Sequence, residues 1–63
     1  MTADDMEALA HAGKEFALGL RRLETDLMPT EPRNGRWLKC VAGLVHKVCT
    51  RIADRADAMR RAP

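Results

Sequence analysis

Apolar residues recur at alternating intervals of three and four in two long segments of the chain. In the first segment they are Met6, Leu9, Gly13, Phe16, Leu20, Leu23 and Leu27. In the second segment they are Trp37, Val41, Leu44, Val45, Val48, Ile52, Ala56 and Met59. This spacing places each set on one side of an α-helix. The pattern therefore predicts two amphipathic helices.

Local signals set the expected ends of these helices. Thr2 and Asp5 have the spacing of a capping box, in which each side chain binds the backbone N–H of the other residue. Pro29 disfavours helical backbone at the residue before it, so the first helix is expected over about 3–28. A turn over 29–35 and a second helix over about 35–60 follow, with Pro32 near its first turn and Asn34 as an alternative cap. The expected fold is an all-α antiparallel two-helix hairpin.

A turn centred near residue 32 pairs Phe16 with Val48 and Leu20 with Leu44, so the two apolar stripes are expected to form the hairpin core. Further apolar residues edge these stripes and are expected to stay uncovered: Ala10, Ala17 and Met28, and on the second helix Leu38, Val45, Cys49 and Ala56. A chain of 63 residues has little room for a core and usually needs a staple or a partner. We therefore predict a homo-oligomeric helical bundle, a dimer or larger, with Leu38, Val45, Cys49 and Ala56 at its interface.

Gly13 interrupts the first stripe and costs about 1 kcal/mol of helix propensity relative to alanine. Close approach of the helices and simple tolerance are the two explanations that the sequence leaves open. Cys40 and Cys49 lie nine residues apart on one helix, about 13 Å along its axis, which is too far for a disulfide. Two free thiols suit a reducing cytoplasm.

Several classes of protein are not expected. The cysteines and histidines lack metal-ligand spacing, and no catalytic constellation is present, so we expect no metal, no cofactor and no enzymatic activity. Acidic residues at Asp4, Asp5 and Glu7 replace the basic start of a signal peptide. No apolar run approaches the ~20 residues of a membrane span, so a cytoplasmic protein is expected.

Charge is distributed unevenly between the two halves. Residues 1–28 hold three basic residues against six acids, a net charge of −3. Residues 29–63 hold eight basic residues against three acids, a net charge of +5. Opposite charges favour antiparallel pairing of the helices, and the basic helix offers a cationic surface to an anionic partner.

The start of the second helix carries the main candidate ligand site. Cations at a helix N-terminus oppose the helix dipole, yet Arg33, Arg36 and Lys39 cluster there. Exposed N–H groups beside guanidiniums suit a phosphate or carboxylate. Trp37 beside them is expected to close the end of the core or to stack on a base, and Arg51 extends the set. The alternative is a solvated turn whose arginines are neutralised by Glu24, Asp26 or Glu31.

Two other surfaces are candidates for binding. Leu18 lies opposite the core stripe with His11 and Arg22 near it, and these three residues form a candidate surface for a protein partner. The basic face of Arg36, Lys39, Lys47 and Arg51 is a weaker candidate for DNA or RNA, since the domain holds only two aromatic residues.

Parts of the chain resemble one family of small phage proteins. The segments are the run from Glu15 to Glu24, which ends in Leu20-Arg21-Arg22-Leu23-Glu24, then Arg36-Trp37-Leu38, and finally Arg51-Ile52-Ala53. These segments are similar to the anti-CBASS cyclic-oligonucleotide sponges, which are oligomeric helical hairpins that sequester host signalling nucleotides. The chain departs from that family in the apolar stretch 41–45. In architecture it also resembles phage hairpins that dimerise and block a host regulator, and plasmid copy-control hairpins that bind RNA.

Three hypotheses follow. The first is a phage-encoded sponge in the host cytoplasm that binds an anionic cyclic nucleotide through Arg33, Arg36, Lys39 and Arg51, with Trp37 near a base. The second is an inhibitor that binds a host protein, such as a transcription regulator, through His11, Leu18 and Arg22. The third is a small DNA- or RNA-binding regulator. All three act by stoichiometric binding.

Overall fold

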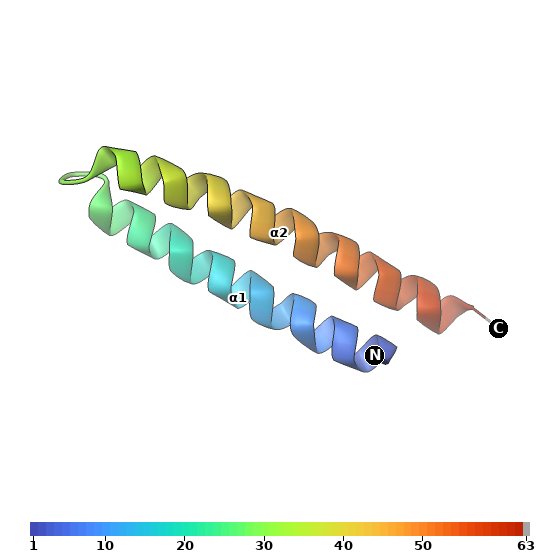
Figure 1. Cartoon of the computed structure of the whole chain (residues 1–63). Helices are drawn as coiled ribbons and strands as arrows, with labels where there is room; N and C mark the ends of the chain where they lie inside the picture. Colours follow the sequence, from blue (N-terminus) through green and yellow to red (C-terminus); the bar gives the residue numbers. More distant parts are fainter. Residues whose placement is uncertain (63) are drawn as a thin grey trace.

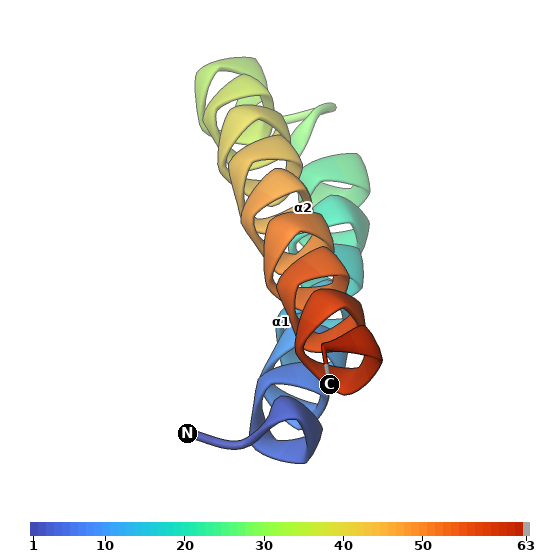
Figure 2. The same ribbon diagram turned by 90° about the vertical axis from the view of Figure 1, so that its right-hand side faces the viewer.

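A computed structural model describes residues 1–62 and shows two long helices joined by a short turn (Figure 1). Helix α1 spans Ala3–Leu27 and helix α2 spans Pro32–Arg61, and the described residues include no strand. The helices lie antiparallel, with both ends of the chain opposite the turn (Figure 1), and cross at a shallow angle (Figure 2). The molecule is a rod 53 Å long. The predicted all-α hairpin is confirmed.

Helix α1 begins at the capping box that the sequence predicts. The backbone N–H of Asp5 donates to Thr2 Oγ1 at 3.1 Å, and the backbone N–H of Thr2 donates to Asp5 Oδ2 at 3.3 Å. These bonds satisfy N–H groups that have no partner inside the helix. The helix ends at Leu27, one residue before the predicted end, and its carbonyl accepts from the N–H groups of Thr30 and Glu31 in the turn.

Helix α2 begins at Pro32, three residues earlier than predicted. Proline fits the first turn because its fixed φ is already helical and its missing N–H has no partner to lose there. The N-cap residue is Glu31, and Asn34 Nδ2 donates to Glu31 Oε1 at 3.0 Å. Asn34 is therefore not the cap, and the turn is confined to residues 28–31.

The contact between the helices, here called the seam, is lined mainly by small residues. The buried residues are Ala10 and Ala17 of α1 and Gly35, Leu38, Ala42, Cys49 and Ala56 of α2. On α2, four of them recur every seven residues, at positions 35, 42, 49 and 56. Met6, Gly13, Leu20 and Leu27 of α1 and Val41, Val45 and Ile52 of α2 are half-buried. Alanine, glycine and cysteine thus occupy the centre of the hairpin.

The predicted core is therefore wrong in its largest members. Phe16 and Val48 were expected to meet inside the hairpin, but they are 59% and 53% exposed. Leu44 is 63% exposed, so the expected pair with Leu20 does not form a core either. Trp37 does not close the end of the core, since it is 66% exposed.

The residues predicted to lie uncovered at the edge of the apolar stripe are instead covered within the hairpin. Leu38, Val45, Cys49 and Ala56 were expected to be left uncovered by the hairpin and to form an oligomer interface. Three of them are buried in the seam and Val45 is half-buried, within a single chain. Because these side chains already pack against α1, they are not a surface that a second hairpin would cover.

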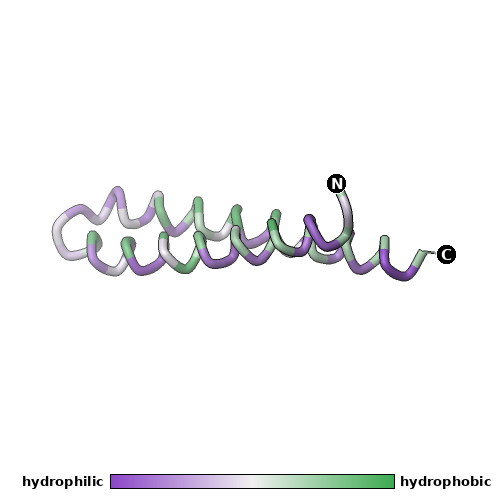
Figure 3. The backbone as a smooth tube through the Cα atoms, turned by 90° about the horizontal axis from the view of Figure 1, so that it is seen from below, coloured by the Kyte–Doolittle hydropathy of each residue, from purple (hydrophilic) through white to green (hydrophobic). Residues whose placement is uncertain are grey.

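Close approach of the helices explains why the small residues are buried and the large apolar residues are exposed. A Cβ built on Gly13 would lie 2.2 Å from Sγ of Cys49, nearer than two atoms can pack. Side chains at the contact set the distance between helix axes, and small ones allow the shortest distances. Each stripe is wider than one partner helix can cover, so contact along the small residues leaves the large ones outside (Figure 3 shows hydrophobic and hydrophilic residues alternating along both helices). Of the two explanations for Gly13, close approach is confirmed.

Arg60 ties the free ends of the two helices together. Its guanidinium donates to Asp4 and also forms an ion pair with Glu7, both in the first turns of α1. The hydrogen bonds to Asp4 and then Glu7 raise the pKa of Arg60 above its ordinary value. These are the only salt bridges among residues 1–62, so the charge asymmetry of the two helices is mostly not used within the hairpin.

We expect Gly13→Ala to destabilise the hairpin although alanine favours helix. Overpacking a tight contact costs ~1–3 kcal/mol, and most of this range exceeds the ~1 kcal/mol gained in helix propensity. Gly19 is the matched control, because a Cβ there meets no atom within 4 Å. Gly19→Ala should raise the melting temperature by several degrees, since ~1 kcal/mol shifts a domain of this size by about 4–8 °C. Circular dichroism melts at one protein concentration measure both.

A second substitution tests whether the Cys49 sulfur is the cause. Adding Cys49→Ala to Gly13→Ala removes the sulfur that the new methyl group meets, so the double variant should recover part of the lost stability. A Gly13→Ala variant that melts higher than the wild type would contradict the close seam.

Candidate functional site

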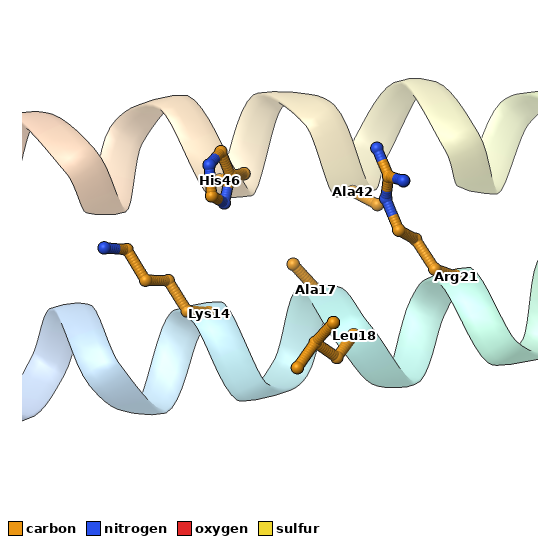
Figure 4. Close-up of a pocket in the computed structure, with 6 residues that line it drawn as sticks. All are labelled: Lys14, Ala17, Leu18, Arg21, Ala42 and His46. Carbon is orange, nitrogen blue, oxygen red and sulfur yellow. The ribbon is translucent and has the colours of Figure 1, made fainter.

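The seam divides the surface of the hairpin into two sides. On each helix, residues immediately after a seam residue lie on one side of the seam, and residues immediately before a seam residue lie on the other. Lys14 and Arg21 of α1 and His46 of α2 each directly follow a seam residue, and they line one groove (Figure 4). On both helices, the residues that directly follow seam residues therefore lie on the same side of the hairpin. The sides that precede seam residues therefore also share one side of the rod.

That opposite side is here called the apolar face. Its members are Leu9, Phe16, Trp37, Leu44 and Val48, which each directly precede a seam residue, and Leu23, which lies seven residues after Phe16 on the same face of α1. All six are among the exposed large hydrophobic residues of the chain. Large apolar patches on a protein surface mark a site of interaction. The apolar face is the candidate surface for association.

The groove on the other side lies between the helices and has a volume of about 460 Å³. Ala17 and Ala42 are buried at its floor, and Lys14 and Arg21 extend from α1 toward α2, with His46 opposite (Figure 4). Leu18 lines the groove from α1 and is 51% exposed. The lining thus combines the cations Lys14 and Arg21 with a mostly apolar surface and contains no acid.

A second, shallower hollow adjoins this groove. Arg21 lines both, and Lys39, Lys47 and Leu44 of α2 line the second, so Leu44 borders both the apolar face and this hollow. No acid occurs in α2 before Asp54. Within residues 1–62, none of these cations makes a salt bridge. The side of the hairpin opposite the apolar face therefore carries positive charge that the described part of the chain leaves uncompensated.

The predicted ligand residues are only partly brought together. Arg33, Arg36, Trp37 and Lys39 lie exposed on the first turns of α2. Arg51 lies twelve residues beyond Lys39, or about 18 Å along the helix axis, so one chain does not join it to that cluster. The described residues show no ion pair between the arginines of the turn and Glu24, Asp26 or Glu31, and these arginines are exposed, as a solvated turn also requires.

The predicted partner residues share one side of α1. His11, Leu18 and Arg22 are all exposed, and their spacing of seven and four residues keeps them on one helical face. Leu18 alone lines the groove, whereas the other two lie outside it. The structure thus connects Leu18 to the cationic side.

Lys14, Arg21 and His46 were not selected from the sequence as a site. Their signal is the position of each directly after the seam residue Gly13, Leu20 or Val45. That signal is readable only once the small residues are known to form the seam, because the predicted core placed the same residues on the outer surface.

Comparison of the chain with protein families, characterised proteins and solved structures finds no significant match. The resemblance to anti-CBASS sponges therefore depends on the short segments that carry it. Among residues 1–62, no group of three histidine, cysteine or acidic side chains is arranged to hold a metal ion. Neither described helix is long and apolar enough to cross a membrane.

The two cysteines report which surfaces the hairpin itself covers. Cys49 is buried in the seam and Cys40 is exposed. In a Cys40→Ala variant, the remaining thiol should react with 5,5′-dithiobis(2-nitrobenzoate) at least ~100-fold more slowly than the thiol of Cys49→Ala, because it reacts only when the helices separate. Full denaturation should make the two rates equal. Equal rates under native conditions would contradict the seam.

Proposed function

We propose that the chain works as a homo-oligomer in which two hairpins bury their apolar faces against each other, and that it acts by stoichiometric binding. The exposed apolar face is the observation that supports this proposal. The buried residues of the hairpin are mostly alanine, glycine and cysteine, so burial of its own core contributes little to the free energy of folding. Phe16, Trp37 and Leu44 offer the apolar surface that it lacks.

The spacing of the apolar face favours another helical hairpin as its partner. Leu9, Phe16 and Leu23 recur every seven residues next to the seam of α1, and so do Trp37 and Leu44 on α2. A two-stranded coil needs two apolar positions in seven, whereas helices that face the core of a bundle carry a third. A second copy of this chain presents the matching stripes and is always present with the first.

The size of the rod sets an upper limit on the contact. One whole side measures 53 × 14 Å, or about 740 Å² in projection, slightly less than the ~800 Å² that each partner contributes to a standard interface. The apolar face covers the part of this side between Leu9 and Leu23 on α1 and between Trp37 and Val48 on α2. Fully burying a large apolar side chain contributes ~1.5–3 kcal/mol, so side chains about half exposed retain ~1 kcal/mol each. Six of them per hairpin amount to a free energy comparable with the ~5–15 kcal/mol stability of a small domain.

Phe16→Glu should dissociate the oligomer. A carboxylate in the centre of the apolar face would have to be buried without a partner, which should raise the dissociation constant at least about a hundredfold, or ~2.8 kcal/mol. Leu18→Glu is the matched control, since Leu18 is on the same helix, is similarly exposed and lies on the cationic side. Size-exclusion chromatography with light scattering reads the mass of both. Equal behaviour of the two variants would contradict the assignment of faces.

We further propose that the oligomer binds an anionic ligand at the start of α2. Arg33 and Arg36 are exposed there, and Glu31, the nearest acid, accepts a hydrogen bond from Asn34. The first turn of α2 holds no acid, and Glu31 makes no side-chain cap. These features support an anion next to the helix N-terminus. The resemblance to the sponge family adds cyclic oligonucleotides as the ligand class.

A thermal-shift screen with cyclic di- and trinucleotides tests this ligand class. A ligand at a hundred times its dissociation constant stabilises the folded state by ~2.7 kcal/mol, so the melting temperature should rise by several degrees. Arg36→Gln should abolish the shift, whereas Arg61→Gln, which removes the same charge at the other end of α2, should keep it. No shift with any cyclic nucleotide at millimolar concentration would reject the ligand class and leave the oligomer untouched.

A further inference from the structure

We propose that the groove between Lys14, Arg21 and His46 is a binding site for a small molecule that carries two or more phosphate groups. This site differs from the one at the start of α2, since neither Arg33 nor Arg36 lines it. It lies on the side of the hairpin opposite the apolar face. The inference therefore does not depend on the oligomer or on the ligand proposed above.

Charge is the first argument for a phosphorylated ligand. Lys14 and Arg21 stand seven residues apart, or about 10 Å along α1, and both extend across the groove toward α2 (Figure 4). Arg21 is shared with the hollow that Lys39 and Lys47 line, so four permanent cations surround one region. The described residues provide no carboxylate to any of them. Cations gathered at this density repel one another unless an anion joins them.

Geometry is the second argument. The guanidinium of Arg21 presents a planar set of N–H donors that binds two oxygens of one phosphate, while Lys14 supplies a point charge to a second group. His46 has ring nitrogens that donate to or accept from the same ligand. The groove thus offers different kinds of donor from both helices within one concave surface.

The floor of the groove limits the size of the ligand. Ala17 and Ala42 are buried and have no polar side-chain atom, and Leu18 adds an apolar wall. The volume of about 460 Å³ is within the ~300–1,000 Å³ usual for small-molecule sites. A long nucleic acid is a poorer fit, because binding of single strands relies on aromatic stacking and this lining contains no aromatic residue.

Isothermal titration with adenosine 5′-triphosphate as the probe tests the site, using the full chain. Arg21→Gln should weaken binding about tenfold or more, equivalent to ~1.4 kcal/mol, because it removes a charged hydrogen-bond donor. Lys14→Gln should weaken it in the same direction. Arg22→Gln is the matched control, since Arg22 is the next residue, is exposed, and lines neither hollow. It should change the affinity less than about twofold.

Far-UV circular dichroism of the ligand-free variants checks that each keeps the helices of the wild type. Equal losses in Arg21→Gln and Arg22→Gln would show a diffuse charge effect and overturn the site. Absence of binding at millimolar adenosine 5′-triphosphate would overturn it as well. A twenty-nucleotide single strand that binds more tightly than the probe, in an Arg21-dependent way, would replace the small molecule by a nucleic acid. Light scattering of the same samples reads the oligomer separately.

Discussion

Close packing of small side chains along the seam determines the rest of this structure. Gly13 lies so near Cys49 that a Cβ there would force the Cys49 sulfur to move, and Ala17 and Ala42 are buried at the middle of the contact. Two helices in such contact lose access to their largest side chains, because a large residue at the seam would push the axes apart. The centre of the hairpin is thus formed by small side chains and Leu38, with the half-buried Leu20 and Leu27 beside them, and Phe16 is left outside.

The seam also sorts the surface by chemistry. The large apolar residues Phe16 and Trp37 directly precede seam positions, whereas Lys14, Arg21 and His46 directly follow them. A rod with one apolar side and one cationic side is suited to two separate tasks. We propose that association uses the first side and that binding of an anion uses the second. In such a dimer the two cationic sides would face outward, away from each other.

The sequence predicted the elements of the fold well because their signals are local. The capping box at Thr2 and the proline at position 29 fixed the extent of α1 to within one residue. The ends of α2 were less accurate, since Pro32 and Asn34 both have start-like properties and only the turn geometry decides between them.

The seam was not predictable from periodicity alone. Phe16 and Ala17 are neighbours on the helix, and both belong to the same broad apolar stripe. From hydrophobicity alone, Phe16 is expected in the core. A short distance between the two helix axes instead favours the smaller Ala17 at the contact. In the sequence, only the recurrence of small residues every seven positions, at Gly35, Ala42 and Cys49, indicates such a close contact. The cationic groove followed from the seam and was missed with it.

Trp37 is the only tryptophan of the chain and lies on the apolar face, where the hairpin alone leaves it 66% exposed. Its fluorescence, measured with a neutral quencher such as acrylamide over a dilution series, therefore tests the central claim most directly. If two hairpins cover each other, quenching should be weak at micromolar concentration and should increase on dilution as the hairpins separate. Strong quenching at every concentration, with the helices intact by circular dichroism, would show that no second copy covers the apolar face.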